Sequence, residues 1–344
     1  MLRRSLIALF ALALLALAVL VAGSLLSLDW GRAHARRTEA LPRLSQASPD
    51  GLVRIEAGGL AFRARVAGLG GAGPGLILLH GYPETSLMWE PLAAAAAGQG
   101  YRVIAFDQRG YSPGARPAGV AAYRLDETVG DVLAVADAAG FADFHLVGHD
   151  WGCVVGWITA VRHPGRLRSW TGLSIPHPGP MIEQLRGGLP TYIRVFNTPW
   201  LPELVFSFGN FALLRRALPE SEALRDEVVA VLAEPGALTA ALNWYRAIPS
   251  GLAGFAGESF EVQPPTLFLW GRREGWVNGA RLEAQRALAR GPYDELELDA
   301  GHWLIEEQTQ AVVGRILAHL DAVEAAAPQA GPGKRDRDGP GDAG

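Results

Sequence analysis

The strongest constraint on the fold of this chain is a series of short apolar runs separated by longer amphipathic segments. Continuous apolar runs of four to five residues are typical of parallel strands that are buried on both faces of a sheet. Between them, segments such as residues 126–139 place their apolar side chains on one helical face. The pattern predicts an α/β protein with helices on both faces of a mostly parallel sheet. The runs lie at residues 76–79, 103–106, 144–147, 170–173, 266–270 and 295–298.

Two more strand-like segments, residues 52–57 and 60–66, precede these runs. Gly58-Gly59 separates them, which predicts an opening hairpin with a tight turn. Together with the six runs they predict a sheet of eight strands, built from residues 50–180 and 260–322.

The interval of residues 181–259 contains no buried-strand run, and it is rich in proline, glycine and aromatic residues. We predict a helical lid over the carboxyl edge of the sheet, where open α/β sheets bind ligands. Most of its aromatic side chains are expected to pack the lid onto the core, and the remainder indicate an apolar substrate.

The two ends of the chain differ from the body. Residues 5–28 carry no charge over 24 positions, which is long enough to span a bilayer at a rise of about 1.5 Å per residue. We expect a single-pass N-terminal membrane anchor. The alternative is a signal cleaved near Val21-Ala22-Gly23, which would make the protein secreted or periplasmic. Arginines flank both sides, so the orientation stays open. Residues 325–344 have the composition of a disordered tail.

Composition excludes several classes of function. The net charge of −4 offers no basic surface for nucleic acid. Cys153 is the single cysteine, which excludes an internal disulfide and a cysteine-based zinc site. The histidines show no metal-ligand spacing, so we expect no metal and no cofactor. The oligomeric state is left open.

The stretch Gly148-His149-Asp150-Trp151-Gly152 lies between a strand and a helical pattern, which is the setting of a nucleophile elbow. Its central residue is aspartate, whose carboxylate has a usual pKa of about 3.9 and is ionised at neutral pH. Attack on an acyl carbon would give a high-energy anhydride, whereas attack on a saturated carbon gives an ordinary ester. Asp150 therefore predicts a substrate with an electrophilic sp³ carbon and a leaving group, either an epoxide or an alkyl halide.

The partners of this nucleophile follow in chain order. Glu274 comes after the run 266–270, and His302 comes after the last run. The acid is placed to accept the Nδ1–H of the histidine. The backbone N–H groups of Tyr82 and Trp151 are candidate oxyanion-hole donors.

Several motifs together resemble the epoxide hydrolase branch of the α/β-hydrolase superfamily over residues 50–322. The apolar N-terminus is also similar to that of the membrane-anchored epoxide hydrolases of animals. The matching stretches are His80-Gly81-Tyr82-Pro83-Glu84, Asp107-Gln108-Arg109-Gly110-Tyr111, Gly148-His149-Asp150-Trp151-Gly152, Pro176-His177-Pro178, Asn243-Trp244-Tyr245-Arg246 and Gly301-His302-Trp303.

The resemblance implies an α/β-hydrolase fold and four catalytic roles. Asp150 would be the nucleophile, His302 the base, Glu274 the acid that orients it, and Tyr245 a proton donor from the lid. The acid is usually aspartate in this branch, so Glu274 is a departure.

A second departure concerns the lid. A second lid tyrosine usually stands where this chain has Val195. Tyr192, three residues earlier, is the candidate replacement; otherwise Tyr245 holds the epoxide alone. Trp151, Tyr192, Val195 and Phe196 are expected to bind substrate.

Three functions remain in competition. The leading hypothesis is an enzyme that opens apolar epoxides to vicinal diols through an ester on Asp150, which water activated by His302 then hydrolyses. A phenol suits an epoxide oxygen, which needs a proton to leave. The alternatives are a haloalkane or haloacid dehalogenase with the same aspartate, and a non-catalytic protein that binds an apolar ligand.

Overall fold

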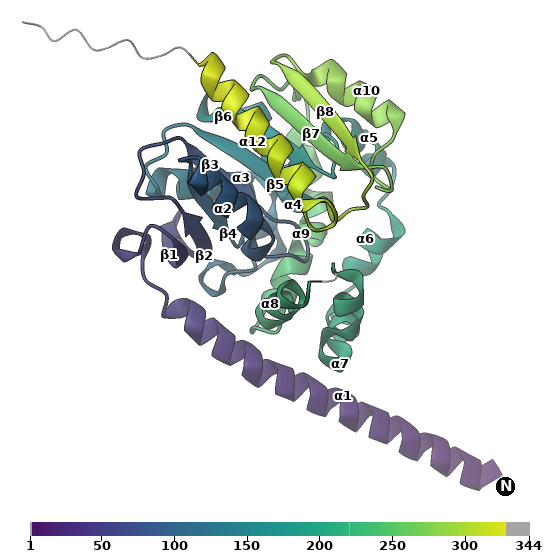
Figure 1. Cartoon of the computed structure of the whole chain (residues 1–344). Helices are drawn as coiled ribbons and strands as arrows, with labels where there is room; N and C mark the ends of the chain where they lie inside the picture. The colour runs from purple at the N-terminus through teal and green to yellow at the C-terminus, as the bar shows by residue number, and fades with distance from the viewer. Residues whose placement is uncertain (1, 220, 328–344) are drawn as a thin grey trace, which may run out of the picture.

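Eight strands form one sheet at the centre of the structure (Figure 1), a computed structural model that describes residues 2–219 and 221–327. The strand order is β1-β2-β4-β3-β5-β6-β7-β8. β2 runs antiparallel to both of its neighbours, and all the other pairs are parallel. The predicted mostly parallel eight-stranded sheet is confirmed. The strands are β1 (Gly51–Ala57), β2 (Leu60–Ala67), β3 (Gly75–Leu79), β4 (Arg102–Phe106), β5 (Phe144–His149), β6 (Leu167–Leu173), β7 (Thr266–Gly271) and β8 (Tyr293–Leu298).

The opening hairpin forms as predicted. Ala57 pairs with Leu60, which leaves Gly58 and Gly59 as the two turn residues. Their φ angles of 57° and 77° lie in the left-handed region, which glycine adopts without the steric cost of a Cβ. The turn therefore needs both glycines.

Helices cover both faces of the sheet (Figure 1). One hydrophobic core joins the sheet to α2 and α12, and a second core on the opposite face joins it to α3, α4 and α10. The central strands β3 and β5 are buried along their whole length, as their continuous apolar runs predict. The covering helices are α2 (Glu90–Gly98), α3 (Leu125–Ala138), α4 (Trp151–Arg162), α10 (Gly279–Leu288), α11 (Leu304–Glu307) and α12 (Thr309–Ala326).

The last strand departs from the expectation of burial on both faces. β8 pairs with β7 alone, so it is an edge strand, and its residues are half-buried or exposed. Its charged side chains form ion pairs with neighbouring loops and helices: Glu295 with Arg286, and Glu297 with Arg272. Residues 295–298 alternate glutamate and leucine, and this alternation, typical of a half-buried strand, was the available signal.

A helical insertion lies between β6 and β7, as predicted for residues 181–259, and it begins slightly earlier, at Gly179. α7 is kinked, because Phe208–Phe211 leave helical backbone geometry. The insertion comprises α5 (Gly179–Gly187), α6 (Thr191–Phe196), α7 (Leu201–Ala217), α8 (Glu222–Leu232), α9 (Ala237–Gly251) and a short 3₁₀ helix (Leu252–Phe255).

The N-terminal helix α1 (Leu2–Glu39) extends away from the body, and it packs against α7 and α8 (Figure 1). The anchor was predicted within this helix. Across residues 2–219 and 221–327, no helix combines the length and apolar character that a membrane crossing requires. At the other end, α12 includes the first two residues of the predicted tail, and residues 328–344 lie outside the described part of the chain.

Candidate active site

Asp150 occupies the sharp turn between β5 and α4. Its φ of 51° and ψ of −118° are rare for a residue with a side chain and mark a strained backbone. The flanking glycines permit the turn: a Cβ on Gly148 would lie 2.3 Å from the carbonyl oxygen of Gly152, and one on Gly152 would lie 2.2 Å from that of Leu79. The sequence frame therefore folds as the predicted elbow.

One oxygen of the Asp150 carboxylate is held by the backbone. The N–H of Tyr82 donates to Oδ1 at 2.7 Å. A Cβ on Gly81 would lie 2.5 Å from the same oxygen, so this position leaves room for the carboxylate only as glycine. In the part of the chain that the structure describes, the Trp151 N–H makes no hydrogen bond to this carboxylate. One of the two predicted donors is thus engaged, and Oδ2 stays free to react.

The structure brings His302 and Glu274 together with Asp150. The Nε2 of His302 lies 3.6 Å from Oδ2 of Asp150, and its Nδ1 lies 2.6 Å from Oε2 of Glu274. The other oxygen of Glu274 accepts a hydrogen bond from the N–H of Trp276 at 3.1 Å. The longer glutamate therefore reaches the histidine at a normal hydrogen-bond distance.

Electrostatics favour a charged histidine in the resting site. Burial by itself lowers the pKa of His302, but the hydrogen bond to Glu274 and the charge of Asp150 raise it to about 9. Burial pushes the pKa of Glu274 upward, and the bond from His302 outweighs this and lowers it. At neutral pH an imidazolium therefore lies between two carboxylates, and Asp150 supplies part of the field that holds its proton.

A second group of side chains fixes the backbone of His302, and the sequence analysis gave it no role. Two donors reach the carbonyl oxygen of His302: Nε2–H of His149 and the hydroxyl of Ser174, both at 2.8 Å. Ser174 itself is buried and has a φ of 69°. Its sequence context carried no signal for this contact.

Behind His149 lies a buried pair of carboxyl groups. The Nδ1 of His149 is 2.9 Å from Oε2 of Glu84. Burial raises the pKa of Glu84 to about 8 and that of Glu306 to about 9. Burial also lowers the pKa of His149, so the neutral imidazole accepts a hydrogen bond at Nδ1 from the protonated Glu84 carboxyl group, while its Nε2–H donates to the carbonyl oxygen of His302. Glu84 and His149 both stand in quoted motifs, which was the available signal.

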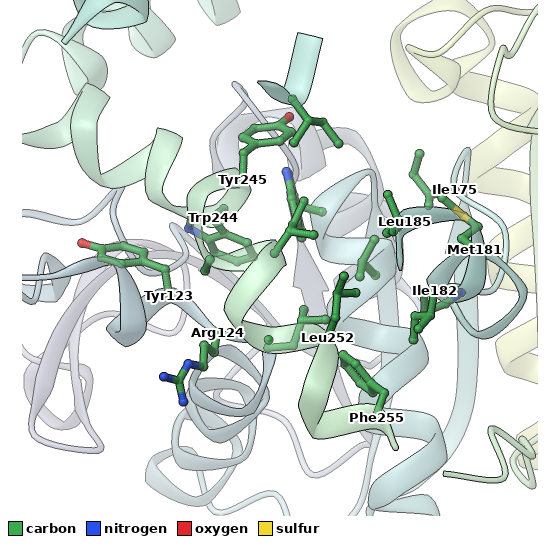
Figure 2. A pocket seen from close by; sticks show the side chains of 18 of the residues that line it. Tyr123, Arg124, Ile175, Met181, Ile182, Leu185, Trp244, Tyr245, Leu252 and Phe255 are labelled. Carbon is green, nitrogen blue, oxygen red and sulfur yellow. The ribbon is translucent and has the colours of Figure 1, made fainter. Parts of the chain in front are cut away.

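A cavity opens over Asp150, between the sheet and the lid. Trp244 and Tyr245 reach it from α9, and aliphatic side chains such as Ile175, Ile182 and Leu185 face them (Figure 2). Most of its lining is apolar, as the aromatic lid predicted. Within residues 2–219 and 221–327, no three His, Cys, Asp or Glu side chains are arranged to hold a metal ion.

Two lid tyrosines line this cavity. The ring of Tyr245 lies 5.2 Å from that of Trp151 and 6.1 Å from that of Tyr192, measured between ring centres. Burial and the nearby charge of Asp150 raise the pKa of Tyr245 well above its usual value. The same causes raise the pKa of Tyr192. Both phenols therefore keep their protons at neutral pH.

The two other expected substrate contacts do not lie on the cavity. Val195 is 45% exposed, and Phe196 packs against Tyr245 with ring centres 4.9 Å apart. On α6, Tyr192 and Ile193 line the cavity, and Phe196, four residues after Tyr192 on the same side of the helix, packs against Tyr192 with ring centres 5.7 Å apart. Val195 and Phe196 are thus not among the residues that line this cavity, and their contact with substrate stays a prediction.

Comparisons with known proteins agree with this geometry. The α/β hydrolase fold family matches residues 74–309. Over 286 residues the chain is 31% identical to mouse epoxide hydrolase 4, covering 78% of each protein. It is 29% identical to epoxide hydrolase A of Mycobacterium tuberculosis over 78% of this chain and 97% of that protein. The solved structure of epoxide hydrolase A from Mycobacterium thermoresistibile superposes with a TM-score of 0.66 at 26% identity, covering 79% of this chain and 98% of the other.

Proposed function

Because the chain belongs to the epoxide hydrolase branch of the α/β-hydrolase superfamily, we propose that it opens apolar epoxides to vicinal diols through an ester on Asp150. One observation carries this proposal: the elbow presents a carboxylate with one oxygen bound by the Tyr82 N–H and the other free. The cavity beside this carboxylate is mainly apolar, and Tyr245 is one of the residues that line it.

The first step forms the ester. Oδ2 of Asp150 attacks a ring carbon of the epoxide, and the bond between that carbon and the ring oxygen breaks. Tyr245 donates its phenol hydrogen to the departing oxygen, which would otherwise leave as an unstabilised alkoxide. The raised pKa of Tyr245 supports this role, because the phenol is fully protonated when substrate binds.

The second step hydrolyses the ester. Ester formation removes the charge of Asp150, so the pKa of His302 falls and the imidazole becomes a competent base. It takes a proton from water, and the hydroxide attacks the Asp150 carbonyl carbon. The Tyr82 N–H stabilises the oxyanion on Oδ1. Collapse of this intermediate breaks the bond between the carboxyl carbon and Oδ2, and the departing alkoxide takes the proton from His302. The diol is released, Asp150 keeps one water oxygen, and the carboxyl proton returns to His302.

A dehalogenase is the second candidate, because three indole side chains, Trp151, Trp244 and Trp276, line the same cavity. Among these three, in the part of the chain that the structure describes, only the N–H of Trp244 is already donated to a backbone carbonyl, that of Arg109. A halide leaving group needs only N–H donors and no proton. Assays with an epoxide and with an alkyl halide, run side by side, separate the two reactions. A protein that turns over neither substrate would be a non-catalytic binder of apolar ligands.

The experiment that tests the proposal is trapping of the ester in His302→Gln. Ring opening needs no base, so this variant should accumulate an adduct on Asp150 that mass spectrometry detects as the added mass of the epoxide. His163→Gln makes the same chemical change at the distant end of α4 and should turn over normally. Asp150→Asn should form no adduct at early times. An adduct on another residue, or normal diol release by His302→Gln, would contradict the proposal.

We further propose that the apolar segment 5–28 attaches the protein to a membrane, as its 24 uncharged residues indicate. The full chain should sediment with membranes and resist extraction by high salt, because salt does not screen hydrophobic contacts. A native N-terminus near Ser24 would instead show that the segment is a cleaved signal.

A further inference from the structure

The lid helix α7 turns an apolar stripe toward solvent. Leu201, Leu204, Val205 and Phe208 follow the spacing i, i+3, i+4, i+7 and are each between 41% and 51% exposed. Such spacing places them on one side of the helix, up to the point where its kink begins. Trp200, immediately before them, is 74% exposed. We call these five residues the lid face.

The charged side of the same helix points inward. Glu203 makes a bidentate ion pair with Arg246 of α9, at 2.8 and 2.9 Å, and also accepts a hydrogen bond from Thr239. A surface helix normally buries its apolar side and exposes its charges. The first turns of α7 do the reverse, with Glu203 paired on the inner side and the lid face outside, so packing within this chain does not account for the lid face.

The position of α1 indicates what covers the lid face. α1 packs against α7 and α8, and a Cβ on its Gly31 would lie 2.0 Å from the carbonyl oxygen of Ala233. His34 fixes the contact through Glu234, with Nδ1 2.5 Å from Oε1. α1 and α7 extend from the same side of the body (Figure 1). Farther along α1, large apolar side chains between Ile7 and Val19 are also exposed.

We propose that the lid face lies on the surface of a lipid bilayer, together with the apolar part of α1. A helix with one apolar side, such as the first part of α7, inserts that side into the boundary between head groups and acyl chains. Trp200 has the side chain that is most enriched at that boundary. Arg194 on α6 and Arg216 at the C-terminal end of α7 are exposed, and their charges suit anionic head groups.

This surface extends to the substrate cavity. Phe206 of α7 packs on Phe196 of α6, with ring centres 5.4 Å apart. On α6, Tyr192 both lines the cavity and is 40% exposed, and Val195 is exposed beside it. Docking of the lid face therefore places the cavity mouth near the lipid. This part rests on the proposed function: an apolar epoxide dissolved in the bilayer would reach Asp150 without crossing water.

The direct test uses single labels on the full chain. Leu204→Cys is labelled with an environment-sensitive fluorophore and mixed with phosphatidylcholine–phosphatidylglycerol vesicles that contain spin-labelled quencher lipids. Glu283→Cys, exposed on α10 at the opposite end of the body, is the matched control. The native Cys153 is fully buried, so unmodified protein gives the labelling blank.

We expect the label at position 204 to shift to the blue and to be quenched by shallow spin labels, whereas the label at 283 stays in water. An unshifted, unquenched label at 204 would overturn the proposal. So would equal quenching at both positions, which indicates non-specific adsorption. These readouts do not depend on catalysis.

The functional test compares two substrates on Leu204→Asn/Phe208→Ser. Hydrolysis of a long-chain epoxide carried in vesicles should fall roughly tenfold, because two apolar side chains no longer favour the lipid. Hydrolysis of a small water-soluble epoxide should not change, which also shows that the variant folds. Equal rates with the vesicle substrate would overturn access from the bilayer. Failure of the unmodified protein with both epoxides would instead refute the proposed function.

Discussion

Asp150→Asn removes the charge that faces Nε2 of His302 at 3.6 Å, and we expect it to lower the pKa of His302. That pKa is raised from 6.5 to about 9, a net stabilisation of the imidazolium by about 3.4 kcal/mol at roughly 1.36 kcal/mol per unit. An opposite charge at this range shifts a pKa by roughly 1 to 3 units. Because the hydrogen bond to Glu274 is the larger stabilising contribution and remains in the variant, we expect a fall of about 1 to 2 units.

The assay is an NMR titration of ¹⁵N-labelled histidine side chains in both proteins. His302→Gln identifies the resonance, and burial lowers the pKa of His145 and His319 to about 4, so these two do not overlap with it. Asp137→Asn changes an exposed aspartate on α3 and serves as the control. An unchanged pKa of His302 in Asp150→Asn would refute the reasoning that ester formation switches the histidine from acid to base.

Two further outcomes follow from the lid and from the buried carboxyl pair. Tyr245→Phe should slow ester formation from an epoxide by roughly 10²–10⁴-fold, as expected for loss of a general acid. In the same burst assay, the rate of ester formation from an alkyl halide should hardly change. A wild-type rate with the epoxide would show that Tyr245 is only a packing residue. Glu306 holds its proton to about pH 9 when folded but loses it near 4.5 when unfolded, so it makes the free energy of unfolding fall by up to about 1.4 kcal/mol per pH unit between these values. In Glu306→Gln the free energy of unfolding should fall less steeply with pH. Denaturant unfolding should therefore show that the variant is slightly more stable than wild type at pH 5 and clearly more stable at pH 8. Parallel pH profiles of the two proteins would contradict this prediction.

The sequence predicted those parts of the molecule that depend on local pattern. Buried strands appear in the sequence as continuous apolar runs. The glycines around Asp150 indicate a turn that is too tight for a Cβ at their positions. The same local logic placed Glu274 and His302 on loops at one edge of the sheet, where they meet. The exposure of β8 was also local, because its glutamates and leucines alternate, but we grouped it with the continuous apolar runs.

The local sequence pattern could not predict contacts between segments that are distant in the chain. Ser174 and His149 hold the carbonyl of His302 across gaps of 128 and 153 residues. The short helix α6 determines which lid side chains meet the cavity. Val195 was assigned from its place in a motif, and such a motif does not reveal how far the side chain is exposed to solvent.

The supports of His302 also bear on how such a protein diversifies. Its carbonyl is fixed from the ends of β5 and β6, and its ring by Glu274 after β7, so the strands alone determine where the base sits. The lid contributes Tyr245 and most of the substrate's surroundings but none of these supports. Substitutions in the lid can therefore change the substrate preference without moving the residues that hydrolyse the ester. Exchange of residues 181–259 between relatives should transfer the substrate preference and leave the rate of ester hydrolysis unchanged.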